Sequence, residues 1–100
     1  MSYKDIHVGD YGWTARLQLT EDGSPFDISS FTTKEMIFYK PDGTQLVKGA
    51  SFVTDGTDGM LQYNVESGVI DASGRWGIRA RIAKSGVDLR SHIVWFYVEE

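Results

Sequence analysis

Apolar and polar residues alternate along two long stretches of the chain, residues 11–20 and residues 75–83. The apolar members are Trp13, Ala15, Leu17 and Leu19 in the first stretch and Trp76, Ile78, Ala80 and Ile82 in the second. A helix would send alternate members of each series to opposite faces, whereas a strand places the whole series on one face. Each stretch is therefore predicted to be an amphipathic β-strand whose apolar face lies in the core.

Further segments of strand length complete the pattern: residues 3–8, 33–40, 44–54, 60–65 and 87–98. Within residues 44–54, Gly49 predicts a bulge or bend. Residues 26–31 follow Pro25 and contain two serines, which favours an ordered connection that crosses between sheets. The last segment is apolar on both faces, because Ile93, Trp95 and Tyr97 interleave with Val94, Phe96 and Val98. Its alternation does not say which face is buried.

Turn-forming dipeptides separate these segments about every ten residues. They are Gly9-Asp10, Asp22-Gly23, Asp42-Gly43, Asp55-Gly56, Asp58-Gly59, Ser73-Gly74 and Ser85-Gly86. Such dipeptides supply the positive φ angles and side-chain-to-backbone bonds of tight turns. About seven antiparallel strands joined in this way predict an all-β fold, an immunoglobulin-like antiparallel β-sandwich, with a small barrel as the main alternative.

The composition narrows the possible functions. One hundred residues with 41% hydrophobic content predict a single domain spanning residues 1–100 with one core. The absence of cysteine excludes disulfides and cysteine-based metal or nucleophile sites, and it is compatible with synthesis in the cytoplasm. A net charge of −4 argues against a nucleic-acid partner. No segment has the pattern of a signal peptide or a membrane span, so we expect neither.

Residues that could carry chemistry are few. The two histidines, His7 and His92, lack a third ligand at metal-binding spacing, and Asp55 and Asp58 are explained by turn formation better than by a calcium site. No Gly-x-Ser-x-Gly elbow surrounds any serine. We therefore expect no catalytic residue, no metal and no cofactor.

The aromatic residues are the remaining functional signal. Trp13 and Trp76 lie on apolar strand faces and are predicted to be core residues. An exposed group among the other aromatic residues would mark a surface that contacts protein or carbohydrate. The last segment supplies the candidate interface, which consists of Ile93, Trp95, Phe96 and Tyr97.

The order of short motifs resembles a known family. The motifs are Val8-Gly9-Asp10, Glu21-Asp22-Gly23, Pro25-Phe26-Asp27-Ile28-Ser29, Pro41-Asp42-Gly43, Gly59-Met60-Leu61-Gln62-Tyr63 and Gly74-Arg75-Trp76. Together they are similar to the N-terminal domain of phage baseplate upper proteins, which occur in tailed phages and prophages of Gram-positive bacteria. Members usually continue into regions that engage receptor-binding proteins, whereas this chain stops at Glu100.

The resemblance implies a non-enzymatic virion component, made in the bacterial cytoplasm, that docks host-adhesion components on the tail baseplate. Its expected partners are other baseplate or tail proteins, or further copies of itself. The alternative hypothesis is a carbohydrate-binding or adhesion module of a larger surface protein. Sugar binding would require tryptophan or tyrosine rings in a solvent-facing row, whereas assembly would require an apolar face or an open sheet edge.

Overall fold

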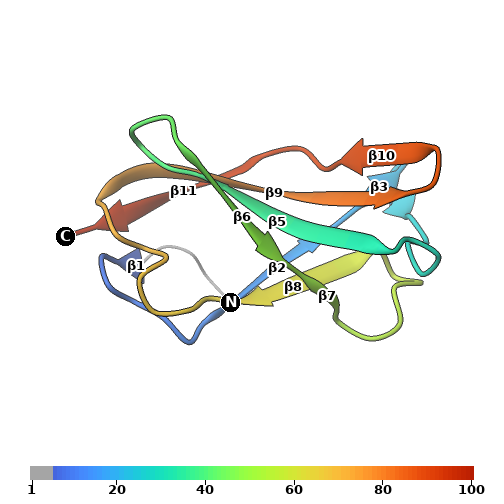
Figure 1. The fold of residues 1–100 in the computed structure, drawn as a ribbon, viewed down its shortest axis with the longest axis horizontal. Helices are drawn as coiled ribbons and strands as arrows, with labels where there is room; N and C mark the ends of the chain where they lie inside the picture. Colours follow the sequence, from blue (N-terminus) through green and yellow to red (C-terminus); the bar gives the residue numbers. More distant parts are fainter. Residues whose placement is uncertain (1–5) are drawn as a thin grey trace.

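The computed structural model describes residues 6–100, which form an all-β fold (Figure 1). The larger sheet contains, in spatial order, β1 (Ile6–His7), β11 (Val94–Glu99), β9 (Gly74–Lys84), β5 (Thr33–Tyr39) and β6 (Gln45–Gly49), and β10 (Val87–Arg90) also pairs with β9. The smaller sheet contains β2 (Thr14–Gln18), β8 (Met60–Asn64) and β7 (Ser51–Phe52). A short hairpin joins β3 (Thr20–Glu21) to β4 (Ser24–Pro25). The all-β prediction is confirmed. Over these residues no helix is long and apolar enough to cross a membrane.

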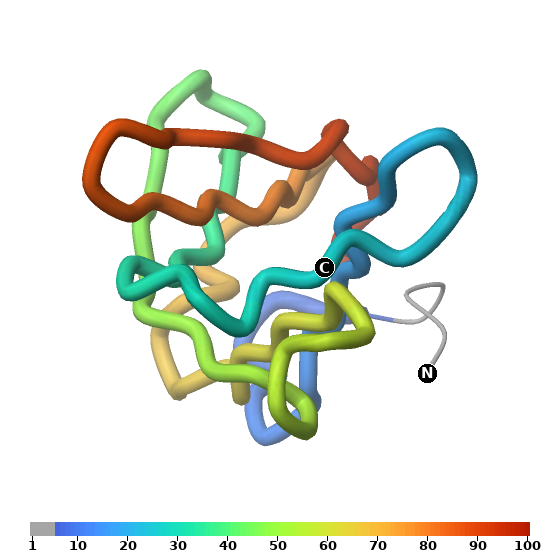
Figure 2. The backbone as a smooth tube through the Cα atoms, turned by 90° about the vertical axis from the view of Figure 1, so that its right-hand side faces the viewer, coloured from blue at the N-terminus to red at the C-terminus, as the bar shows by residue number. Residues whose placement is uncertain are grey.

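The strands curl around one core, which draws residues from both the larger and the smaller sheet (Figure 2). Both predicted apolar series point into this core. Ala15, Leu17 and Leu19 are buried, Trp13 packs against them, and all four members of the β9 series are fully buried. Trp76 is the largest of them, and its indole N–H donates a hydrogen bond to the carbonyl of Ala72 at 3.0 Å. This bond ties β9 to the loop that precedes it.

Residues 44–54 form two strands in place of the one predicted. β6 belongs to the larger sheet and β7 to the smaller one, and the chain runs diagonally from β6 to β7 (Figure 1). The break falls at Ala50, whose N–H donates to the carbonyl of Lys34 at 2.9 Å. The predicted bend is therefore present, one residue after Gly49, and it carries the chain from the larger sheet to the smaller one.

Residues 87–98 are also divided, into β10 and β11. Arg90 pairs with Arg81 and Val94 pairs with Ile78. The three residues between β10 and β11, residues 91–93, therefore lie opposite only two residues of β9, residues 79–80. This is a β-bulge with one extra residue. Ser91 holds it in place, because its hydroxyl oxygen accepts the N–H of Ala80 at 2.9 Å and its hydroxyl donates to the carbonyl of His92 at 2.9 Å.

The extra residue changes which side chains face the core. Leu89 pairs with the inward-facing Ile82, and after the bulge Phe96 pairs with the inward-facing Trp76. Phe96 is therefore buried, while Trp95 and Tyr97 point to the opposite face of the sheet. At the other end of the chain, β1 pairs in parallel with β11, and the predicted strand residues 3–5 lie outside the described part.

Candidate interaction surface

The outer face of the larger sheet carries most of the exposed aromatic and basic side chains of β9 and β11. The strand registers place Trp95 of β11 beside Gly77 of β9, and Gly77 beside Tyr39 of β5. In the next row, Arg79 lies beside Ile37, and Ile37 beside Val47 of β6. Trp95, Tyr97 and Val47 are exposed on this face. We call the residues of these two rows, together with Ile93, Tyr97 and Arg75, the outer surface.

Trp95 lies at one side of the outer surface and is 49% exposed. The Arg75 guanidinium lies over its ring, 4.3 Å from the centroid, in a cation–π contact. Gly77 allows the ring to lie close to the sheet, because a β-carbon there would come within 2.8 Å of Cζ3 of Trp95. Tyr97, two residues further along β11, is 61% exposed. The two aromatic side chains thus present a large accessible area on one face.

Ile37 forms a second apolar part of this surface. It is 6% exposed, yet it does not belong to the core cluster that the other buried apolar residues form. Its register neighbours on the outer face are Arg79 and Val47, and Val47 is 49% exposed. Val47 therefore presents an exposed apolar side chain on this face, while the neighbouring Ile37 is almost fully covered.

Arginine side chains are held in fixed positions around this apolar area. Arg81 donates to both carboxylate oxygens of Asp88, at 3.0 and 2.8 Å, and to Glu35 at 2.7 Å. The hydrogen bonds from Arg81, followed by its charge, lower the pKa of Asp88 from its usual value. Arg79 donates to the carbonyl of Ser91 at 3.0 Å. Bidentate and carbonyl-bound arginines lose little further freedom when a partner docks, because their rotamers are already restricted.

The structure divides the candidate interface residues between the two faces of the sheet. Trp95 and Tyr97 are exposed, and Ile93 is partly buried at the bulge beside Gly77. Phe96 is 7% exposed and packs against Trp13 and Trp76, with ring centroids 6.4 and 6.3 Å apart. Phe96 therefore belongs to the core of the described fold.

Sequence reasoning missed several members of the outer surface. Arg75 and Arg79 alternate with the buried series of β9, so the alternation itself indicated that they share the opposite face. Ile37 and Val47 carried no comparable signal. Their proximity depends on the pairing of β5 with β6.

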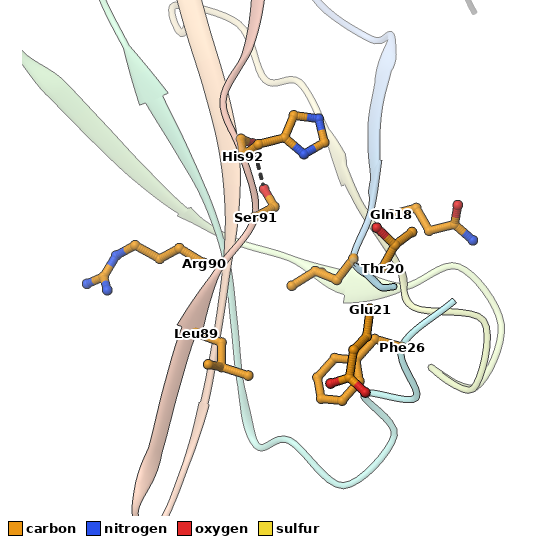
Figure 3. Close-up of a pocket in the computed structure, with 9 residues that line it drawn as sticks. Gln18, Thr20, Glu21, Phe26, Leu89, Arg90, Ser91 and His92 are labelled. Atoms are coloured by element: carbon orange, nitrogen blue, oxygen red, sulfur yellow. Dashed lines mark hydrogen bonds between the residues drawn. The ribbon is translucent and has the colours of Figure 1, made fainter. Parts of the chain in front are cut away.

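A shallow pocket of about 240 Å³ lies between the end of β2 and β10 (Figure 3). Its lining includes the apolar Leu19, Phe26 and Leu89 and the polar Glu21 and His92. The Ser91 hydroxyl donates its proton to the carbonyl of His92, which is not a base that could activate it as a nucleophile.

The remaining candidates for chemistry have structural roles. Asp55 accepts hydrogen bonds from the N–H and hydroxyl of Thr57, at 3.0 and 2.7 Å, and Asp58 accepts the N–H of Met60 at 3.0 Å. Both aspartates thus form turns, as predicted. His7 lies in β1, 3.6 Å from Glu99, and His92 lies in the break between β10 and β11. Residues 6–100 contain no group of three or more potential metal ligands.

A search among curated proteins finds no match. The model of the BppU N-terminal domain family, the N-terminal domain of the baseplate upper protein, matches residues 6–100, which is the whole described part of the chain. The chain therefore belongs to the baseplate upper protein N-terminal domain family, and its role is a structural one in the tail baseplate of a phage.

Proposed function

We propose that this protein is a non-enzymatic docking module that binds other baseplate proteins through the outer surface. The observation that carries this proposal is the exposure of Trp95 and Tyr97 on a sheet face that also holds Ile37, Val47 and fixed arginines. Tryptophan, tyrosine and arginine are the residue types that contribute most to binding energy at protein interfaces. In this view the protein is made in the bacterial cytoplasm and assembles into the virion tail.

The scaffold for this role is, we propose, a single immunoglobulin-like β-sandwich that spans residues 1–100. The strand order β1-β11-β9-β5-β6 against β2-β8-β7 supports it, because immunoglobulin domains have a corresponding division of strands between sheets. The bond from Trp76 to Ala72 supports it too, since a corner aromatic in these domains bonds to backbone a few residues upstream. One core cluster draws residues from both sheets.

A protein partner fits the outer surface better than a sugar does. Sugar-binding sites use rows of rings whose faces are accessible for stacking. Here Trp76 is fully buried and the guanidinium of Arg75 lies over the ring of Trp95. An aromatic residue that is already stacked on arginine, next to exposed Val47 and Tyr97, has the composition of a protein interface.

Co-expression with the other tail proteins of the same phage tests the proposal. The double variant Trp95→Ala and Tyr97→Ala is expected to lose co-purification with the baseplate, while Tyr11→Ala retains it. Tyr11 is a matched control because it is 66% exposed but lies in the loop between β1 and β2, outside the strands that form the outer surface. Equal recovery of the double variant and of wild type would refute the outer surface as the docking site.

A further inference from the structure

Strand β6 is an open edge of the larger sheet, with β5 as its one neighbour among the described residues. Two hydrogen bonds that flank β6 determine which of its residues bond to β5. Lys40 N–H donates to Thr44 O, and Ala50 N–H donates to Lys34 O, each at 2.9 Å. Hydrogen-bonded pairs alternate along an antiparallel ladder, so the even-numbered residues of β6 bond to β5. The backbone N–H and C=O groups of Gln45, Val47 and Gly49 therefore point away from the sheet.

This edge lacks most of the features that keep a strand from pairing with another chain. The side chains of Gln45, Val47 and Gly49 are uncharged and exposed, and Lys48 is the only charged residue of the strand. The bend at Ala50 comes only after these three residues. Natural edge strands are usually shortened, bulged or charged to prevent such pairing.

The edges at β1, β7, β10 and β2 are protected in these ways. β1 and β7 have two residues each, and β10 follows a hairpin and ends in the Ser91 bulge. Asp88 of β10 forms ion pairs with Arg81 and with Arg90. β2 carries Arg16 at its centre and exposes no large apolar side chain. β6 is thus the edge best suited to accept a strand.

We propose that β6 pairs with β6 of a second copy of this chain, antiparallel about a two-fold axis at Val47. This register places Val47 opposite Val47 of the second copy, and Gln45 opposite its Gly49. All three outward-facing residues then find hydrogen-bonding partners, and each such pair exchanges two bonds. The result is one continuous sheet in which the outer surfaces of both copies lie on the same face.

Charge repulsion and the number of hydrogen bonds favour the axis at Val47 over an axis shifted by one residue. Shifting the axis to Lys48 would place two lysines directly opposite each other, which is destabilising. Shifting it to Leu46 would leave Gly49 without a β6 partner. With the axis at Val47, Lys48 lies opposite Leu46 of the second copy, and the apolar Val47 side chains meet on the outer face. Because the two-fold contact uses the same edge of both copies, it closes at a dimer.

The contact is small, so a weak dimer follows. One five-residue strand pair buries less than the roughly 1,200 Å² of a standard stable interface, so we expect a weak dimer with a dissociation constant on the order of 100 μM to 1 mM. In analytical ultracentrifugation of the 100-residue chain from about 10 μM to about 1 mM, the average mass should rise from 11.2 kDa toward twice that value. A constant mass of 11.2 kDa over the whole range would overturn the proposal.

Two lysine variants locate the contact. Val47→Lys places like charges opposite each other and should remain monomeric, and its circular dichroism should be unchanged because Val47 is 49% exposed. Leu89→Lys is the control, because Leu89 is 40% exposed on the competing edge β10. The proposal would be overturned if Val47→Lys dimerised with the dissociation constant of wild type. It would also be overturned if only Leu89→Lys failed to dimerise.

Single cysteines test the register directly, because the chain has no cysteine of its own. Opposed Cα atoms in a hydrogen-bonded pair are about 5.5 Å apart, which lies within the disulfide range. Val47→Cys should form a covalent dimer on mild oxidation, whereas Gln45→Cys should do so only when mixed with Gly49→Cys. Cross-linking of Val47→Cys no faster than of a Leu89→Cys control would refute the register. These measurements need no baseplate protein. The dimer proposal can therefore be refuted while docking through Trp95 and Tyr97 is confirmed, and docking can be refuted while the dimer is confirmed.

Discussion

Replacing Gly77 by alanine should displace Trp95 from the outer surface without unfolding the protein. The added β-carbon would lie 2.8 Å from Cζ3 of Trp95 and 2.9 Å from Cγ2 of Ile93. Carbon atoms in contact stay about 3.5–4.0 Å apart, so the ring must move by roughly 1 Å. Movement of the ring also disturbs its cation–π contact with Arg75. The backbone can remain in place, because both obstructing groups are side-chain ends.

The expected change in stability combines three small terms. Alanine in place of glycine inside a strand stabilises by roughly 0.5–1 kcal/mol. Against this stand the Arg75–Trp95 contact, worth about 0.5–1 kcal/mol, and a steric cost at the low end of about 1–3 kcal/mol. Gly49→Ala is the matched control, since Gly49 also lies in a strand and has no heavy atom within 4 Å of its added β-carbon. Gly77→Ala should therefore be about 1–2 kcal/mol less stable than Gly49→Ala.

Urea unfolding at low protein concentration measures the difference in stability, and the indole N–H signal of Trp95 in a proton–nitrogen NMR spectrum reports the ring movement. Binding to the baseplate should weaken in Gly77→Ala and remain unchanged in Gly49→Ala. Equal stabilities together with an unmoved Trp95 signal would show that Trp95 does not pack over Gly77 as described.

Three further predictions concern the core and the ionisable groups. Phe96→Asp should abolish cooperative unfolding, because removing a core phenylalanine costs about 3–5 kcal/mol and the new carboxylate would be unpaired; folding equal to that of the control Tyr97→Asp in circular dichroism would contradict this. The hydroxyl and N–H of Thr57 lower the pKa of Asp55 below its usual 3.8, so this stabilisation is present above pH 3.8 and lost as the pH falls through the folded-state pKa. The urea midpoint should thus fall more steeply below about pH 4 in wild type than in Asp55→Asn, and parallel curves would argue against it. Burial, followed by the hydrogen bond to Glu66, raises the pKa of Tyr63 from 10.0 to about 12, so stability should decline as the pH rises through this interval. Spectrophotometric titration of wild type minus Tyr63→Phe isolates this group, and ionisation near pH 10 would contradict the prediction.

Much of the fold could be predicted because local chemistry determines it. The alternating series of β2 and β9 point into the core as predicted, since an apolar side chain at every second position of a strand can be buried on only one face. The turn at Asp55 follows from an aspartate that bonds to its own backbone two residues later. Each of these features depends on residues that are neighbours along the chain.

The outer surface was only partly predictable. The alternation of β9 indicated that Arg75 and Arg79 face away from the core. It gave no sign that Ile37 and Val47 would join them, because that contact requires β5 to pair with both β9 and β6. Strand pairing brings together residues that are distant in sequence, and a single sequence records no such proximity.

The sequence by itself determined the all-β class, the turns and the buried face of each amphipathic strand, because polar and apolar alternation has one stable orientation. It left the last strand undetermined, because both of its faces are apolar. Only the tertiary structure decided that Phe96 is buried and that Trp95 and Tyr97 are exposed. The physical reason is the bulge at Ser91, where one extra residue, held by hydrogen bonds to β9, reverses the side-chain alternation.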